Sequence, residues 1–214
     1  MSKNKRKPTA YGVFIIECLR PGDAADAKVM HQILEMSNII ALYHTSNTIL
    51  EFEQQVSDFK KSNFRYLHLS CHADAAGLEI EGQDYSNQRL ADLLKDGMDN
   101  KRLFMSACQG ANRNLAKKII NGCNAASLIG TPVKLYFDKS VLFWPSFYHL
   151  INEIDQVKMN RKLLISTLQK CTDLFGVAIN YYSKINVSPN ALRRLKIRKG
   201  QPPTDERLIT KPLK

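Results

Sequence analysis

The 214-residue sequence predicts one α/β domain with a mostly parallel sheet. Apolar runs typical of strands alternate with segments of helical periodicity, which is the pattern of a sheet covered by helices. Two of these apolar runs end in the reactive side chains of His72 and Cys108. The carboxyl ends of parallel strands share one edge of a sheet, where open α/β folds gather their chemistry. We therefore expect these two side chains to meet there.

Hydrophobic spacing and turn residues define the elements of the first half of the chain. Between the apolar runs, apolar residues recur every three or four positions, as on a helix with one buried face. The pair Pro21 and Gly22 favours a turn after the first run. The predicted elements are a strand over residues 11–18, a helix over 24–37, a strand over 39–43, a helix that begins at Thr48, and a strand over 66–70 that leads to His72.

The second half continues the alternation of strands and helices. Ser86 is placed to cap a helix, and the pair Asn121 and Gly122 is a conventional helix end. Prolines beyond residue 188 indicate a loosening tail. The predicted elements are a hairpin over 77–82, a helix over 86–94, a strand over 103–107 that leads to Cys108, a helix over 112–120, a strand over 125–129, a helix that Asp138 caps and Pro145 kinks, and one or two helical segments over 159–183.

The formal net charge of +11 lies mainly near the two ends of the chain. Residues 1–7 carry four basic groups, and residues 191–214 carry eight basic groups against two acidic ones. The segment between them is nearly neutral, so composition implies no basic face on the folded body. We divide the chain into a basic N-terminal tail over 1–10, a folded domain over 11–188 and a basic C-terminal tail over 189–214. Solvated tails are the simplest interpretation; RNA, an acidic partner and membrane headgroups are the alternative contacts.

Cysteine usage and hydropathy indicate a cytoplasmic protein. The five cysteines occur singly inside apolar runs, which favours a reducing compartment over a disulfide framework. Glu17 ends the first apolar stretch too early for a secretory signal, and no run approaches the roughly 20 apolar residues of a membrane span. The sequence has no paired spacing of metal ligands and no glycine-rich phosphate loop, so we expect neither a metal nor another cofactor.

A thiol and an imidazole at neighbouring strand ends form a nucleophile and its proton carrier. The thiolate is the reactive form of cysteine, and an imidazolium or a helix amino end nearby increases the thiolate fraction at neutral pH. His72 would then protonate a leaving amine. The backbone N–H groups of Cys108 and of the turn after His72 are the natural donors for a negatively charged oxygen.

The residues around the pair resemble a known family. The segment 106–110, Ser-Ala-Cys-Gln-Gly, differs from the caspase signature only at its first position, and His72 with Ala73 resembles the family's His-Gly. Both blocks more closely resemble those of the bacterial CHAT proteins, which are caspase-like and separase-like cysteine peptidases of clan CD. The resemblance covers residues 10–155, loosely outside the two blocks. It implies a caspase-like three-layer α/β/α sandwich, a catalytic dyad of His72 and Cys108, and an oxyanion hole made by the N–H groups of Ala73 and Cys108.

Substrate specificity is the part of the resemblance that the sequence leaves open. Ser106 stands where caspases have glutamine and where several arginine-directed relatives have aspartate. In this family the loop after the first strand often adds a charge to the pocket, and here it holds Glu17, Arg20 and Asp23. Arg20 would favour an acidic substrate residue, whereas Glu17 or Asp23 would favour a basic one. The separase-like relatives favour the basic residue, and a charged turn without a substrate role is the alternative.

Several neighbours of the pair have ordinary structural explanations. Cys71 shares a strand face with Leu67 and should belong to the core, pointing away from the site. Asp74 is expected to be a solvated loop carboxylate, with orientation of His72 as the alternative. Trp144 is expected in the core, with the wall of a substrate groove as the alternative.

These observations predict a cysteine endopeptidase that cleaves a protein substrate. Many CHAT proteins are fused to, or encoded beside, sensing partners, so the resemblance implies activation by a partner in bacterial antiviral or cell-suicide signalling. The alternative is a catalytically inactive caspase-like scaffold or regulatory module, which Ala73 and Ser106 motivate as departures from the family pattern. A third hypothesis is RNA binding through the C-terminal tail, with an affinity that falls steeply as salt rises.

Overall fold

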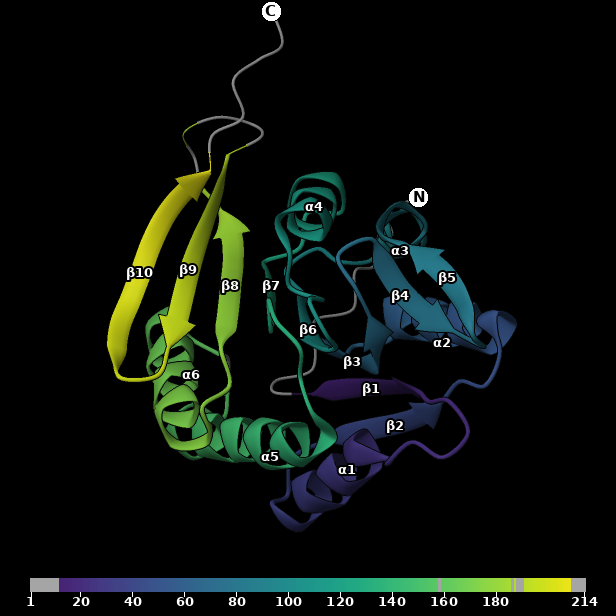
Figure 1. The fold of residues 1–214 in the computed structure, drawn as a ribbon, viewed down its shortest axis with the longest axis horizontal. Helices are drawn as coiled ribbons and strands as arrows, with labels where there is room; N and C mark the ends of the chain where they lie inside the picture. Colours follow the sequence, from purple (N-terminus) through teal and green to yellow (C-terminus); the bar gives the residue numbers. More distant parts are fainter. Residues whose placement is uncertain (1–11, 158, 186, 188–190, 209–214) are drawn as a thin grey trace, which may run out of the picture.

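A computed structural model of the chain describes residues 12–157, 159–185, 187 and 191–208. One sheet runs through the molecule in the order β10-β9-β8-β7-β6-β3-β1-β2, and the short strands β4 and β5 extend from β3. Helices cover both faces of this sheet (Figure 1). The predicted three-layer α/β/α sandwich is confirmed.

The central strands are parallel, and they carry the predicted apolar runs. Strand β1 is buried along its whole length, because its neighbours lie on both sides and helices lie on both faces. Its start is placed at residue 13, and Tyr11 lies outside the described residues. The parallel strands are β1 (Val13–Cys18), β2 (Ala41–Thr45), β3 (Tyr66–Ala73), β6 (Arg102–Ser106) and β7 (Ser127–Gly130).

The helices and the small hairpin occur in the predicted order. The strands β4 (Gly77–Ile80) and β5 (Gln83–Ser86) are joined by Glu81 and Gly82, which both have positive φ, as a two-residue hairpin turn requires. Within the described ranges, no helix is long and apolar enough to cross a membrane. The helices are α1 (Asp26–Met36), α2 (Ile49–Lys61), α3 (Asn87–Leu94), α4 (Arg113–Ala116) continued by the π-helical turn η1 (Lys117–Gly122), α5 (Phe137–Ile154) and α6 (Arg161–Phe175).

Two hydrophobic cores lie on the opposite faces of the sheet. Phe14 and Ile16 of β1 enter the core beneath α2, α3 and α4, whereas Val13 and Ile15 enter the core beneath α1, α5 and α6. This alternation is the period of two that a strand imposes on its side chains. Trp144 is buried in the second core, which confirms its predicted structural role.

Side-chain caps fix the starts of several helices, and the helix start at Thr48 and the cap at Ser86 are as the sequence predicts. The hydroxyl of Thr48 accepts the N–H of Glu51, whose carboxylate accepts the N–H of Thr48 in return, so a complete capping box begins α2. The hydroxyl of Ser86 accepts the N–H of Arg89 at the start of α3, and the side-chain oxygen of Asn112 accepts the N–H of Leu115 at the start of α4. These caps satisfy N–H groups that lack partners within the helix.

Two predicted boundaries near the end of the chain are wrong. Asp138 does not cap α5, because the helix already begins at Phe137 and Asp138 lies in its first turn, where the helix dipole favours a carboxylate. The helical pattern predicted to reach residue 183 stops at Phe175, because Gly176 takes the left-handed conformation that ends a helix. The following residues form strand β8 (Ile179–Lys184), which is antiparallel to β7.

The segment predicted as a basic C-terminal tail is part of the sheet over residues 191–208. Strands β9 (Leu192–Arg198) and β10 (Gln201–Leu208) form a hairpin that extends β8. Some of its positive charges are paired across the strands, since Arg193 pairs with Asp205 and Arg194 pairs with Glu206. Pro202 and Pro203, two of the prolines that suggested a loose tail, lie at a register shift on the edge strand, where a missing N–H is tolerated.

Candidate active site

Aligned strand ends bring His72 and Cys108 to one pocket. Parallel pairing sets Ser70 of β3 opposite Ser106 of β6. His72 lies two residues beyond Ser70, and Cys108 lies two residues beyond Ser106, so both emerge at the same edge of the sheet. They line a pocket of about 150 Å³ together with the segment 134–137. The sheet therefore places the two predicted residues in one site.

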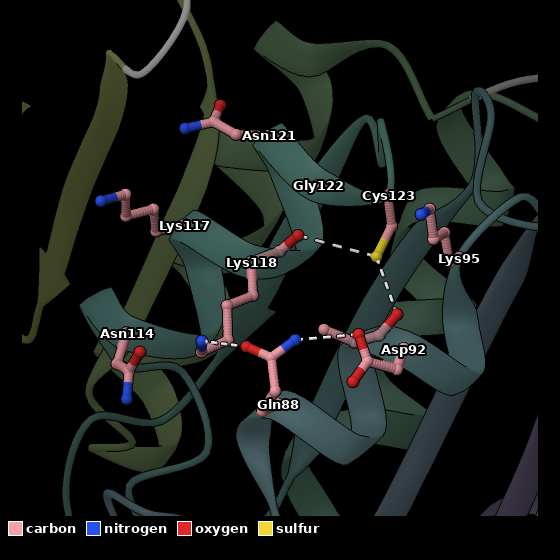
Figure 2. A pocket seen from close by; sticks show the side chains of 10 residues that line it. Gln88, Asp92, Lys95, Asn114, Lys117, Lys118, Asn121, Gly122 and Cys123 are labelled. Atoms are coloured by element: carbon pink, nitrogen blue, oxygen red, sulfur yellow. Dashed lines mark hydrogen bonds between the residues drawn. The ribbon is translucent and has the colours of Figure 1, made fainter.

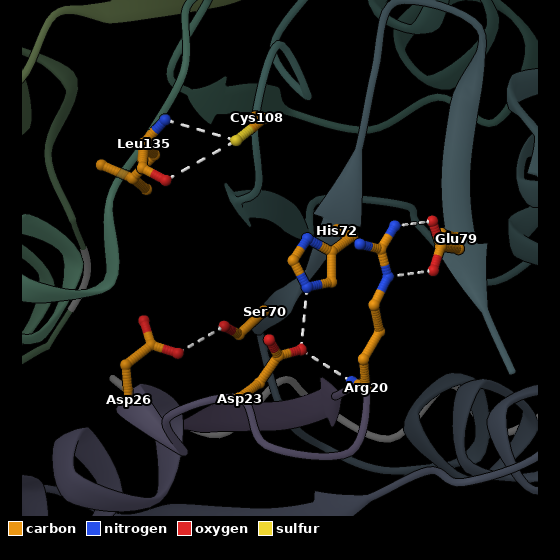
Figure 3. A network of polar contacts seen from close by, with 8 residues as sticks. All are labelled: Arg20, Asp23, Asp26, Ser70, His72, Glu79, Cys108 and Leu135. Carbon is orange, nitrogen blue, oxygen red and sulfur yellow. Dashed lines mark hydrogen bonds and ion pairs between the residues drawn. The ribbon is translucent and has the colours of Figure 1, made fainter. Parts of the chain in front are cut away.

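The imidazole of His72 is hydrogen-bonded to a carboxylate. Its Nε2 lies 2.8 Å from Oδ2 of Asp23, a residue of the loop after β1. Figure 3 shows the ring between Asp23 and the side on which Cys108 lies. Asp74 has a different role, because its Oδ1 accepts the N–H groups of Ala76 at 2.7 Å and Gly77 at 3.0 Å within its own turn. The carboxylate that contacts His72 is thus Asp23, which the sequence had suggested as a pocket charge.

An ion pair lies beside the His72 ring. The guanidinium of Arg20 donates two hydrogen bonds to the carboxylate of Glu79, which is the cross-strand partner of His72 on β4. This bidentate pairing lowers the pKa of the Glu79 carboxyl. Arg20 is absent from the lining of the nucleophile pocket, but it lines an adjacent pocket of about 430 Å³ with His72 and Ala73, so its role in substrate binding stays a prediction.

The thiol of Cys108 contacts the backbone of Leu135. The N–H of Leu135 donates to Sγ at 3.4 Å, and Sγ lies 3.6 Å from the carbonyl oxygen of Leu135. The N–H of Gln109 donates to the carbonyl of Val133 at 3.0 Å, which fixes the same loop to the turn after the thiol. Val133 and Tyr136 of this loop are exposed large apolar side chains. The loop over residues 131–136 therefore lies against the thiol and presents apolar surface to solvent.

Ala73 is compatible with a role as an N–H donor. It lies at the end of β3 and is not among the described residues with positive φ, so an alanine is accommodated without strain. The N–H of Asp74 donates to the carbonyl of Gly77 on β4. Antiparallel pairs alternate, so the N–H of Ala73 points away from β4. In Figure 3 Glu79 of β4 and Cys108 lie on opposite sides of His72.

Hydroxyls and one carboxylate form the polar wall of the pocket. Asp26 at the start of α1 is buried, and its Oδ1 accepts the hydroxyl of Ser70 at 2.9 Å. Ser106 lines the pocket as predicted, and its hydroxyl lies 2.6 Å from that of Ser140 on α5. Lys134 lies at the exposed rim, over the ring of Tyr136. The acidic group in this pocket is therefore Asp26, which the sequence analysis missed.

Glu17 is wrong as a predicted pocket residue. It is fully buried behind α1, where its carboxyl accepts the N–H of Ala27 at 2.8 Å and the hydroxyl of Tyr43 at 2.6 Å. Burial raises the pKa of Glu17 to about 7, against the effect of these two hydrogen bonds. The hydrogen bond from the N–H of Ala27 to the Glu17 carboxyl holds the first turn of α1, which carries Asp26. Glu17 therefore supports the position of Asp26 and does not face the pocket itself. The signal for Asp26 was its position at a helix start next to the sheet edge.

Cys71 packs against the core cluster that contains Leu67, as predicted. Part of the residue nevertheless borders the pocket, so it does not point away from the site entirely. Burial raises the pKa of the Cys71 thiol well above its ordinary value. Of the two thiols at the pocket, Cys71 is therefore held in its unreactive protonated form.

A larger pocket of about 500 Å³ lies elsewhere, between α3 and η1 (Figure 2). Its thiol, Cys123, donates to the carbonyl of Ala91 at 3.2 Å, and burial raises its pKa to about 11. Gln88 links Lys118 to Asp92 across the opening. Over the described part of the chain, no group of three or more His, Cys, Asp or Glu side chains is arranged to hold a metal ion. The larger pocket thus lacks an available nucleophile, and the site at the sheet edge is the better candidate.

Comparison with known proteins supports the fold. No family model matches the sequence, and no curated protein matches it. The chain is similar in structure to a secreted C11 cysteine protease from Bacteroides thetaiotaomicron, solved in complex with an irreversible peptide inhibitor, with a TM-score of 0.54 and 8% identity. The match covers 82% of this chain and 66% of that protein, which is just under two thirds of its length. The fold is therefore caspase-like, and this likeness does not distinguish the CHAT proteins from other caspase-like proteins.

Proposed function

We propose that this protein is a cysteine endopeptidase of the caspase-like type, with Cys108 as nucleophile and His72 as proton carrier. The observation that carries the proposal is the single pocket lined by a thiol and an imidazole at aligned strand ends. The structural similarity to a C11 cysteine protease supports it at the level of the fold. Membership in the CHAT group, which the sequence motifs suggest, is part of this proposal.

The reaction follows from the positions of the groups. Cys108 passes its proton to His72, and its thiolate attacks the carbonyl carbon of the substrate. The N–H groups of Cys108 and Ala73 stabilise the oxyanion, each worth roughly 10²–10³ in rate. His72 then gives the proton to the leaving amine, and a thioester remains on Cys108. A water that transfers its proton to His72 hydrolyses this thioester, and the free thiol is restored.

Asp26 supports a preference for a basic residue before the cleaved bond. Its buried carboxylate borders the pocket beside Cys108, and the remaining polar groups there, Ser70, Ser106 and Ser140, are neutral hydroxyls. A lysine or arginine side chain of the substrate would pair with this carboxylate away from water, where the interaction is stronger than at the surface. The ammonium of Lys134 lies at the exposed rim, where solvent screens it.

Activation by a partner protein is the second part of the proposal. The backbone of Leu135 contacts the thiol of Cys108, and a partner that moves the loop over residues 131–136 would change how a substrate carbonyl reaches Sγ. The exposed apolar residues Val133 and Tyr136 offer a partner a contact on this loop. Antiviral or cell-suicide signalling in a bacterial cytoplasm is the setting that the CHAT resemblance suggests. Full activity of the isolated protein, with no partner added, would contradict this part.

Peptide cleavage tests the mechanism. We expect peptides with arginine or lysine before the scissile bond to be cleaved faster than matched peptides with aspartate or leucine. Cys108→Ala and His72→Ala should each lower kcat by roughly 10³-fold or more, because Cys108 supplies the attacking thiolate and His72 carries the protons. Cys71→Ala removes the neighbouring thiol and is the matched control, with activity retained. Cleavage that survives both Cys108→Ala and His72→Ala would refute the mechanism.

Asp26→Asn tests the preference separately. This change keeps the size of the side chain and removes its charge, so cleavage after arginine should fall by about 10²-fold while cleavage after leucine changes little. An equal loss on both peptides would assign Asp26 a purely structural role.

If the wild-type protein cleaves no peptide and its Cys108 does not react with iodoacetamide, the inactive scaffold becomes the better description. Binding of RNA or an acidic partner through the basic segments 1–10 and 189–214 stays a prediction; residues 1–10 lie outside the described ranges.

A further inference from the structure

The turn after β1 aims one carboxylate at the proposed catalytic imidazole. Pro21 and Gly22 occupy the two central positions, Gly22 has a φ of 90°, and the N–H of Asp23 donates to the carbonyl of Arg20 at 3.1 Å. These features define a type II turn, in which only glycine takes the third position freely. The turn sends the Asp23 side chain back over Arg20, whose N–H donates to Oδ2 at 2.7 Å. The second partner of that same oxygen is His72, at 2.8 Å.

We propose that Asp23 is the positioning residue of His72, so that the peptidase site is a Cys-His-Asp triad instead of a dyad. This inference rests on the proposed function of Cys108 and His72. A carboxylate only accepts hydrogen bonds, so Nε2 must carry the proton and Nδ1 is left as the acceptor. The ring nitrogen that does not face Asp23 lies on the side of Cys108 in Figure 3. Asp23 therefore selects the tautomer that receives the thiol proton, and it stabilises the imidazolium that results.

The other charges around the ring leave this role to Asp23. Arg20 reaches the site from the same turn and Glu79 from β4, but each neutralises the other in a bidentate pair. Cys108 faces the ring from the end of β6, and Phe137 of α5 contacts it edge-on with centroids 6.0 Å apart. Burial opposes ionisation of Asp23, but the hydrogen bonds from Arg20 and His72 outweigh it and lower the pKa of the Asp23 carboxyl.

Asp23→Asn separates the charge from the shape of the turn. Because one oxygen, Oδ2, contacts both Arg20 and His72, the asparagine oxygen can still accept both N–H groups, but it carries no charge that stabilises an imidazolium. We expect kcat to fall by about 10²-fold with little change in KM, because the substrate does not touch Asp23. Asp23→Glu should restore part of kcat.

Asp74→Asn is the matched control. Asp74 follows His72 by two residues and carries the same charge, but it bonds only to its own turn. A general electrostatic effect of nearby carboxylates would lower the activity of both variants alike, and equal losses would overturn the positioning role while leaving the peptidase intact. Thermal unfolding of both variants checks that the fold is kept.

The tautomer of His72 gives a readout that does not depend on cleavage. In protein carrying Cys108→Ala, ¹⁵N-edited NMR of the histidine side chains at alkaline pH should show the proton of His72 on Nε2. With Asp23→Ala added, which removes the acceptor of Nε2–H, the fraction of the Nδ1–H form should rise. An Nδ1–H tautomer with Asp23 present would overturn the inference without any appeal to activity. If the tautomer changes as expected but the wild-type protein cleaves nothing, the positioning role holds and the proposed peptidase function fails.

Discussion

Replacing the buried His68 should make the fold less sensitive to acid. His68 on β3 is inaccessible to solvent, its Nδ1 lies 3.0 Å from the hydroxyl of Tyr148, and its ring packs edge-on against Trp144. Burial lowers the pKa of His68 from 6.5 to about 3, because the charged imidazolium would lose its hydration. The unfolded chain thus binds the proton more readily, and the free energy of unfolding falls as the pH drops from about 6.5 toward 3.

The size of the effect follows from these two pKa values. Between about pH 7.5 and pH 5, the proton taken up by the unfolded state should cost the fold about 2 kcal/mol. Glu17 acts in the opposite direction, because burial raises its pKa to about 7 and its contribution to stability is lost as the pH rises. The difference in unfolding free energy between wild type and the His68 variant therefore isolates the effect of His68, whereas the pH dependence of the wild type alone does not.

Urea unfolding at several pH values measures this difference. His68→Asn keeps an acceptor near Tyr148 but cannot take up a proton, so it should be less stable at neutral pH and lose less stability on acidification. His149→Asn is the matched control, because His149 is exposed on the same helix as Tyr148 and its replacement should leave the pH dependence as in the wild type. Parallel curves for wild type and His68→Asn would refute the idea that the fold keeps this imidazole neutral.

Three further predictions test the packing around the site and the edge of the sheet. Gly130→Ala would place a Cβ 2.6 Å from the carbonyl of Met105 and should cost about 1–3 kcal/mol of unfolding free energy in chemical unfolding. Gly122→Ala is the control, because its Cβ meets open space. Equal stability of the two variants would contradict the close approach of β6 and β7. Deleting residues 191–214 should expose one edge of β8 and lower the melting temperature sharply in circular dichroism, whereas removal of a mere tail would leave it unchanged. Glu17→Gln should gain stability relative to wild type as the pH rises from about 5 to 8, because the raised pKa of Glu17 keeps its carboxyl protonated in the folded state to a higher pH than in the unfolded chain. A difference in unfolding free energy between the two proteins that stays constant across that range would argue against a buried carboxyl.

The tail was misread for a physical reason. Leu192, Leu195 and Ile197 are buried in β9, but three arginines and a lysine between and around them gave the segment the composition of a solvated end. The acidic residues that pair with two of these arginines, Asp205 and Glu206, lie beyond two prolines. Charge counted along the chain does not reveal such pairing, because it arises only when the two strands align.

The sequence by itself determined the order of strands and helices, the helix starts at Thr48 and Ser86, and the placement of His72 near the end of one strand and of Cys108 just beyond another. Each of these features depends on residues within a few positions of one another, so local spacing is enough to predict it. Only the tertiary structure decided which carboxylate serves which group: Asp23 contacts His72, Asp26 borders the pocket, and Glu17 is buried behind α1. The three lie within ten residues, and their different roles come from partners far away in the chain that the sheet brings beside them.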